Sequence, residues 1–274
     1  MTQTLAIYQI DAFASGPLMG NQACVMPMDA FLPDETLQAI AAENNVAETA
    51  FIVKTSDNSW ALRWFTPTIE VPLCGHATLA SAHVLFNHLG FDGGVLHFDT
   101  VQSGRLSVSK MSDGRLMMDF PSAPIHEIPV SDDVADALGA RPVQAWGGMF
   151  YAARFESPSD VLALNPDIGK LAALGLADGA DCDRGNCGCF AAGGAGVDVT
   201  SRFFAPASGI NEDPATGSWH TMLARIMSER FGMDTLSCLQ AYPGRGGEID
   251  TILRGDRVSL MGRGVTVIEG RFHL

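Results

Sequence analysis

The chain has 274 residues, of which 47% are hydrophobic and 18% are charged. This composition excludes a disordered chain, and the length suits one large domain or two of ordinary size. The formal net charge is −14, and the Lys and Arg residues form no dense cluster, which argues against nucleic acid and anionic membranes as partners. A small anionic substrate is compatible with this charge, because a local site can present hydrogen-bond donors whatever the global balance.

Neither a membrane span nor an export signal is expected. No apolar run in the sequence reaches the roughly 18 residues that a membrane helix needs. Residues 1–11 lack the basic flank and apolar stretch of a secretion signal. The six cysteines are therefore expected to be reduced thiols of a cytoplasmic protein.

The first half of the chain predicts strands around a buried helix. The expected elements are a helix at 33–44, strands at 51–53 and 61–65 around a turn at 57–59, a helix at 77–89, and strands within 95–108. Apolar residues cover nearly every face of the segment 77–89, which indicates a helix enclosed by other elements. Gly90 provides a C-terminal stop for it.

The second half predicts a similar order of elements. These are a helix at 132–138, a glycine-rich hairpin turn at 193–196, a helix at 219–231, strands within 236–253 and a last strand at 265–274. The helix at 219–231 is apolar in its first half and polar at its end, so only its first half is expected to be deeply buried.

An internal repeat relates the two halves. The segment Phe51–Arg63 matches Phe190–Arg202, and each is followed by two aromatic residues, one further residue and then a proline. Further along, Gly75 matches Gly217, and a helical stretch follows both. A repeat of this length indicates duplication of a whole domain rather than a solenoid. We therefore expect an α/β fold of two similar lobes, each a mixed sheet around one central helix.

The expected lobes are residues 1–124 and 125–274, and the last strand is expected to pack back on the first lobe. Both central helices begin with a glycine followed by a polar residue, Gly75-His76 in the first and Gly217-Ser218 in the second. A helix N-terminus presents unpaired N–H groups and the positive end of the helix dipole, so it can bind an anion. If the lobes face each other by approximate two-fold symmetry, both N-termini can converge on one ligand. The alternative is that each glycine simply allows a strand to turn into a helix.

Two carboxylates stand beside these motifs. Glu48 precedes a strongly apolar strand, and Asp213 lies in the run Asp213-Pro214-Ala215-Thr216-Gly217-Ser218. By position alone, Glu48 is an ordinary solvated residue and Asp213 is a turn or N-cap residue ahead of a proline.

Taken together, the motifs resemble a known family. They are Gly20-Asn21, Glu48-Thr49-Ala50-Phe51, Arg63-Trp64-Phe65-Thr66-Pro67, Cys74-Gly75-His76-Ala77-Thr78 and Glu212-Asp213-Pro214-Ala215-Thr216-Gly217-Ser218. In this order the sequence resembles the phenazine-biosynthesis PhzF-like isomerases, over essentially the whole chain. The resemblance implies the diaminopimelate epimerase fold, with two pseudo-two-fold-related lobes, and a homodimer.

The resemblance also implies a role for each matching residue. Glu48 takes the place of the general acid/base that moves a proton between substrate carbons, with His76 and Asp213 as further catalytic residues. The residues expected to bind the substrate are Asn21, Cys74, Gly75, Thr216, Gly217, Ser218 and Arg245. Arg245 belongs to a Gly-Arg loop in which Gly246 replaces the usual proline. The expected substrate is a small carboxylate, and neither a cofactor nor a metal is expected.

Two other functions compete with this interpretation. A pyridoxal-independent racemase of the same fold uses two cysteines as acid and base, and Cys74 stands at the first of these positions. The repeat places Thr216 at the second, where a hydroxyl is too weak a base to replace a thiolate. A binding protein that has lost its activity is the other alternative. Cys182, Cys187 and Cys189 have neither paired spacing nor a nearby histidine, so no structural zinc is expected.

Overall fold

A computed structural model describes residues 3–175 and 182–274. The chain divides into two compact units, one formed by residues up to Asp119 together with Met261–Leu274, the other by Phe120–Leu260. The division thus falls at 119/120 and again at 260/261, where the sequence suggested 124/125. The last strand belongs to the first unit because it pairs along its length with the first strand of the chain.

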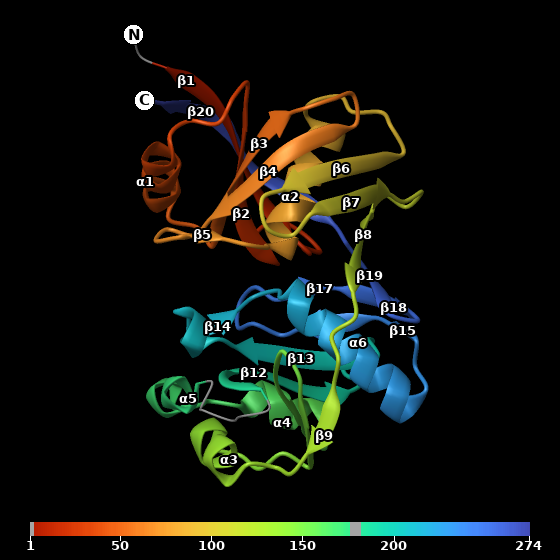
Figure 1. Cartoon of the computed structure of the whole chain (residues 1–274). Coiled ribbons are helices and arrows are strands. Elements are labelled where there is room, and N and C mark those ends of the chain that lie inside the picture. Colours follow the sequence, from red (N-terminus) through yellow and green to blue (C-terminus); the bar gives the residue numbers. More distant parts are fainter. Residues whose placement is uncertain (1–2, 176–181) are drawn as a thin grey trace. The chain divides into compact units, whose positions relative to one another are not determined.

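The first unit contains a sheet with the helices α1 and α2 (Figure 1). Its elements are β1 (Thr4–Ala12), β2 (Asn21–Met28), α1 (Asp34–Asn44), β3 (Glu48–Lys54), β4 (Ser59–Phe65), β5 (Glu70–Val71), α2 (Gly75–Asn87), β6 (Val95–Thr100), β7 (Arg105–Lys110), β8 (Leu116–Pro121) and β20 (Gly264–His273). The strand order is β8-β7-β6-β4-β3-β2-β1-β20, with β5 on the side of β4. The pairs β2–β3 and β4–β6 are parallel, and the others are antiparallel.

The second unit has its own sheet and more helices. Its elements are β9 (His126–Ile128), α3 (Asp132–Leu138), β10 (Gln144–Gly147), β11 (Phe150–Arg154), α4 (Pro158–Ala163), α5 (Ile168–Leu174), β12 (Asp183–Ala192), β13 (Val199–Phe204), the 3₁₀ turn Pro206–Ser208, β14 (Glu212–Asp213), α6 (Gly217–Phe231), β15 (Thr235–Leu236), β16 (Cys238–Gln240), β17 (Gly247–Glu248), β18 (Asp250–Arg254) and β19 (Arg257–Gly262). The sheet order is β17-β16-β13-β12-β11-β10-β9, with β14 beside β13. The short helices α4 and α5 have no counterpart among the predicted elements.

The repeat seen in the sequence is a repeat of topology. In the first unit β3 and β4 are antiparallel, β5 adds antiparallel to β4, and β6 adds parallel to β4. In the second unit β12, β13, β14 and β16 have the same directions and neighbours. A central helix, α2 or α6, leads from the short strand to the parallel strand in each case. The predicted α/β fold of two similar lobes, each with one central helix, is confirmed.

A bidentate ion pair is duplicated with the fold. In the first unit Arg63 donates Nε and Nη2 to the two carboxylate oxygens of Glu70, both at 2.7 Å. In the second unit Arg202 donates the same two nitrogens to Glu212, at 2.7 and 2.8 Å. Each pair joins the central strand to the short strand that leads into the helix, and a two-point contact of this kind fixes direction as well as distance.

The central helices differ in how far they are enclosed. In α2 every residue from His76 to Ala82 is buried, as are Val84, Leu85 and Phe86. In α6 burial is confined to residues up to Met227, and the last turn is exposed. Both patterns agree with the distribution of apolar residues in the sequence. Beyond α6, the side chains of α3, α4 and α5 pack with the alternate residues of β11 and β12 in a second core.

Gly188 allows α6 to lie directly on the sheet of the second unit. A Cβ atom at Gly188 would come within 2.4 Å of the ring of Trp219, which is fully buried. The indole packs with Phe190 and Phe203 on the same side of β12 and β13. The absence of a side chain at Gly188 is therefore a packing requirement for the start of α6.

Candidate active site

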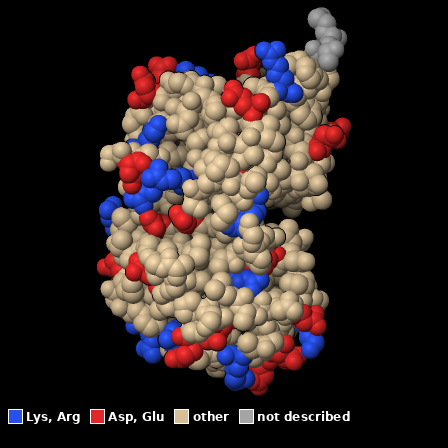
Figure 2. All heavy atoms as spheres, turned by 180° about the vertical axis from the view of Figure 1, so that it is seen from behind, with Lys and Arg blue, Asp and Glu red and all other residues tan. Residues whose placement is uncertain are grey.

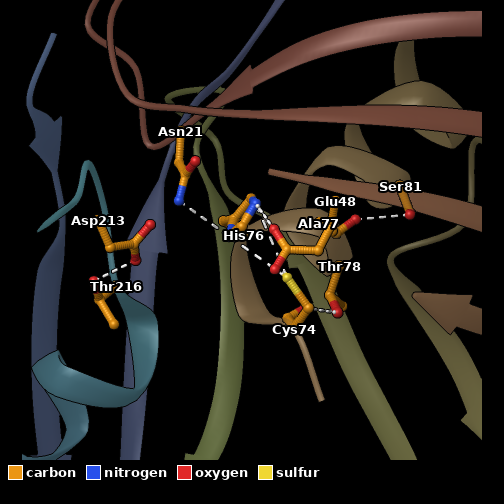
Figure 3. A network of polar contacts seen from close by, with 9 residues as sticks. All are labelled: Asn21, Glu48, Cys74, His76, Ala77, Thr78, Ser81, Asp213 and Thr216. Carbon is orange, nitrogen blue, oxygen red and sulfur yellow. Dashed lines mark hydrogen bonds and ion pairs between the residues drawn. The ribbon is translucent and has the colours of Figure 1, made fainter. Parts of the chain in front are cut away.

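Four of the predicted residues meet in the first unit (Figure 3). Asn21 is the first residue of β2 and Glu48 is the first residue of β3. The two strands are parallel, with Ala23 opposite Glu48, so both strands begin at the same end of the sheet. Cys74 is the N-cap of α2, and His76 is in its first turn. The cluster is thus assembled where two parallel strands and one helix all begin.

Glu48 and His76 form the core of this cluster. The Oε2 atom of Glu48 lies 2.9 Å from Nε2 of His76, with the side chains 17% and 8% exposed. The other ring nitrogen of His76, Nδ1, lies 3.3 Å from Nδ2 of Asn21 and 3.5 Å from Sγ of Cys74. The imidazole therefore stands between a carboxylate on one side and an amide and a thiol on the other.

Oε2 of Glu48 has a charged neighbour but no well-directed donor. It is buried and, among the described residues, accepts no hydrogen bond of good geometry, although Nε2 of His76 is at contact distance. A buried carboxylate oxygen in this state costs free energy unless another group satisfies it. A substrate proton is one such group.

The surroundings set the charge of His76 and Cys74. Burial by itself would lower the pKa of His76, but Cys74 and Glu48 raise this pKa well above 6.5. Burial, followed by the charge of Glu48, raises the pKa of the Cys74 thiol. The surroundings thus favour the charged form of His76 and the neutral form of Cys74.

Gly20 positions Asn21 for this contact. Gly20 has a φ of +66°, and a Cβ atom there would lie 2.2 Å from the carbonyl oxygen of Ala12. Only glycine combines this backbone conformation with such a close approach. The Gly-Asn motif noted in the sequence is therefore a turn that delivers the Asn21 side chain to the start of β2.

The second unit gathers its predicted residues at the start of α6. Thr216 is the N-cap of α6, and its hydroxyl donates a short hydrogen bond to Oδ2 of Asp213. Gly217 and Ser218 form the first turn of the same helix. Arg245 lies apart from them in sequence, in the loop between β16 and β17, where its N–H donates to the carbonyl of Tyr242. Gly246 beside it has a φ of +71°, a conformation that a proline ring forbids.

Gln240 is a residue of this second group that the sequence did not indicate. Its side chain is fully buried. Its Oε1 accepts from the N–H of Thr216 at 2.8 Å, while Nε2 donates to the carbonyl of Asp213 at 2.6 Å and to the Thr216 hydroxyl at 3.0 Å. Because Nε2 occupies a lone pair of that hydroxyl, the hydroxyl proton is directed to Asp213. Its position in the short strand Cys238–Gln240 carries no motif that could have revealed it.

Both central helices begin without a side-chain cap. In α3, α4 and α5 the side chains of Ser131, Ser157 and Asp167 accept from the first turn. In α1, α2 and α6 the cap positions are Pro33, Cys74 and Thr216, and none of these side chains accepts a well-directed capping bond, although the backbone of Ala77 approaches the Cys74 sulfur. Of these helices, α2 and α6 begin among the predicted site residues, where a first turn without a strong cap can bind an anion.

The surface agrees with the charge pattern of the sequence. On the face drawn in Figure 2, Lys and Arg side chains are dispersed among Asp and Glu and form no basic patch. Among the described residues, no helix has both the length and the apolar character that crossing a membrane requires.

Comparison with known proteins identifies the family. The model of the phenazine biosynthesis-like protein family matches residues 10–270. The chain belongs to this family. A protein of Pseudomonas aeruginosa named as an uncharacterized isomerase is 42% identical over 273 residues, which cover 98% of this chain and 99% of that protein. The crystal structure of a PhzF-family phenazine biosynthesis protein from Enterococcus faecalis has a TM-score of 0.92 at 37% identity and covers 99% of this chain and 100% of that one.

A more distant structure extends the likeness in fold. A hydroxyproline epimerase from Agrobacterium vitis superimposes with a TM-score of 0.60 at 11% identity, covering 99% of this chain and 93% of that one. At this identity the likeness concerns the fold alone. It supports the epimerase type of fold that the family resemblance implied.

Proposed function

We propose that this protein is a cofactor-independent isomerase that moves a proton between two carbons of a small carboxylate, with Glu48 as the general acid/base. The observation that carries this proposal is the contact between the largely buried Glu48 carboxylate and the His76 ring, 2.9 Å apart. The isomerase class is also supported by the name of the Pseudomonas aeruginosa relative.

Glu48 has the properties that a proton carrier needs. Its carboxyl group lies beside the His76 ring and is mostly shielded from water, with 17% of the side chain exposed. It can take a proton from an activated substrate carbon and return the same proton to another carbon, so that it ends in its original state. Because the protons taken and returned balance, this chemistry needs no electron acceptor and no group carrier.

His76 acts on Glu48 and on the developing charge. When Glu48 accepts the substrate proton, it no longer offers His76 a negative charge. The imidazolium can then stabilise the negative charge that appears on the substrate. Asn21 and Cys74 hold the ring from the side of Nδ1, at 3.3 and 3.5 Å. These contacts keep Nε2 of His76 at 2.9 Å from Oε2 of Glu48.

The uncapped first turn of α2 provides a binding site for the substrate carboxylate. This turn begins at Gly75, one residue beyond Cys74, so an anion held there lies in the immediate surroundings of Glu48. The prediction that Gly217, Ser218, Thr216, Asp213 and Arg245 act on the same ligand stays a prediction, as do the homodimer and the cytoplasmic location.

Exchange of substrate hydrogen in deuterated water tests the proposal. We expect the protein to incorporate deuterium into small carboxylates that it binds, and we expect Glu48→Gln to lower the exchange rate at least about 100-fold while ligand binding persists. Glu43→Gln is the matched control, since Glu43 lies exposed on α1. Unchanged exchange in Glu48→Gln would refute Glu48 as the proton carrier. A wild-type protein that binds such carboxylates without exchanging them would instead support the non-catalytic alternative.

A further inference from the structure

Three side chains with different metal-binding atoms converge at the start of α2. Glu48 offers a carboxylate oxygen, Cys74 a sulfur and His76 a ring nitrogen, and these atoms all lie within 4.8 Å of one another. Cys74 and His76 are buried, and Glu48 keeps the cluster in partial contact with solvent. Within residues 3–175 and 182–274 this is the one group of three or more such residues with that spacing.

The separations fit a small tetrahedral cation. Nε2 of His76 lies 2.9 Å from Oε2 of Glu48 and 4.0 Å from Sγ of Cys74. Zinc bonds of about 2.0–2.3 Å at tetrahedral angles place ligand atoms about 3.3–3.8 Å apart. Opening the first pair and closing the second by less than about 1 Å each, and bringing the Glu48 oxygen and Cys74 Sγ from within 4.8 Å to the same spacing, would complete three corners of a tetrahedron.

We propose that Glu48, Cys74 and His76 bind a thiophilic divalent cation, of which Zn²⁺ and Cd²⁺ are examples, and that the bound cation blocks proton transfer. The mixed sulfur, nitrogen and oxygen ligands favour such ions over Mg²⁺ and Ca²⁺, which require oxygen ligands. On binding, the Cys74 S–H bond and the N–H bond at Nε2 of His76 break, both protons go to solvent, and the freed electron pairs of Sγ and Nε2 form the bonds to the cation. The fourth position is left for water or for a small anion.

Asn21 supplies the support that a metal-binding histidine normally has. A ligating histidine carries its proton on the other ring nitrogen and donates it to an acceptor. Nδ1 of His76 lies 3.3 Å from the carboxamide of Asn21, and rotation of that amide presents its oxygen in place of its nitrogen. Asn21 can therefore serve the ring both with and without a cation.

The inhibitory part of this inference rests on the proposed function. A cation on Oε2 takes the electron pair with which Glu48 would accept the substrate proton. Cation binding itself is independent of any substrate, so it can be measured even if no substrate is found.

The test uses the full-length protein, without substrate, titrated with Cd²⁺. We expect one Cd²⁺ per chain and an ultraviolet thiolate-to-cadmium charge-transfer band, absent in Cys74→Ser and unaffected by excess Mg²⁺. Cys187→Ser is the matched control, because Sγ of Cys187 lies 3.8 Å from Sγ of Cys189 in the core of the second unit. A band that survives in Cys74→Ser, or one that disappears in Cys187→Ser, would overturn the assignment.

Two further variants keep the test independent of folding effects at Cys74. We expect Glu48→Gln and Asn21→Ala to keep the band but to weaken Cd²⁺ binding about 10-fold or more. If both variants bind Cd²⁺ as tightly as the wild type does, the assignment of the site is wrong. Zn²⁺ should abolish deuterium exchange in the wild type, and EDTA should restore it; exchange that is faster with Zn²⁺ would overturn the inhibitory role. Cadmium binding without exchange activity under any condition would leave the cation site standing and refute the proposed isomerase.

Discussion

Thr216 occupies in the second unit the position that Cys74 occupies in the first. Each is the N-cap of the central helix, with an extended backbone and no capping hydrogen bond from its side chain. Yet their side chains have different partners, because Cys74 contacts His76 whereas Thr216 donates to Asp213. The repeat has thus kept the backbone of the two sites and changed their chemistry.

This difference predicts the behaviour of Cys74→Ala. We expect the variant to retain deuterium exchange within about 10-fold of the wild type, because the proposed proton carrier is Glu48. A two-thiol mechanism would need a second cysteine at Thr216 of the second unit, where a hydroxyl stands instead. A racemase that depends on thiols would instead become inactive. Loss of exchange in Cys74→Ala, with normal thermal unfolding, would therefore favour the racemase alternative.

Gln240 is expected to stabilise the segment that contains Asp213 and Thr216. Gln240→Ala removes three hydrogen bonds to Thr216 and Asp213 and leaves a cavity in a fully buried position. We expect a loss of about 2–4 kcal/mol in the free energy of unfolding, measured by urea titration. Gln144→Ala, which removes one partly buried bond to Arg154, should cost about 1 kcal/mol or less. Similar losses in both variants would contradict a special role for Gln240.

Gly188 provides a test of the packing of α6. Gly188→Ala should lower the free energy of unfolding by about 1–3 kcal/mol or more, because the added methyl group would overlap the buried Trp219 ring. Near-ultraviolet circular dichroism should report the displaced tryptophan. Gly16→Ala is a suitable control, since a Cβ atom at Gly16 meets no atom within 4 Å. A variant as stable as the wild type would show that α6 does not need this close contact.

Stability at acid pH is expected to depend on His220. Burial lowers the pKa of His220 to about 4 from its ordinary 6.5, and its Nε2 is buried without a hydrogen-bond partner among the described residues. The folded state therefore favours the neutral ring. Its contribution to stability is present above pH 6.5 and is lost as the pH falls from about 6.5 to about 4. The free energy of unfolding should fall by about 2–3 kcal/mol over this range from His220 alone.

The matching variant is His220→Asn. Its side-chain amide can still donate to the carbonyl of Thr216, as Nδ1 of His220 does at 2.8 Å, but it does not titrate. We expect a shallower decline of stability with acid than in the wild type, measured by urea unfolding at several pH values. His126→Asn, at an exposed position of β9, is the control for loss of a histidine. An unchanged slope in His220→Asn would contradict the assignment.

The amino-acid sequence by itself determined the class of fold, the two central helices and the family. This was possible because these features depend on local patterns that a duplicated chain carries twice, such as Arg63 and Arg202 at matching places before Gly75 and Gly217. The enclosed character of α2 was equally readable, since apolar residues surround it on every face. The short helices α4 and α5 were not predicted, although α3, which is as short as α5, was.

Only the tertiary structure decided which side chains meet. Glu48 and His76 lie on different elements, and their contact depends on the register of β2 with β3 and on where α2 begins. The partners Glu70, Glu212 and Gln240 were likewise invisible, because a polar residue does not show in sequence which distant group will satisfy it. The spacing of apolar residues along the sequence predicts which residues are buried. The pairing of buried polar groups depends instead on distances between segments that are far apart in the chain.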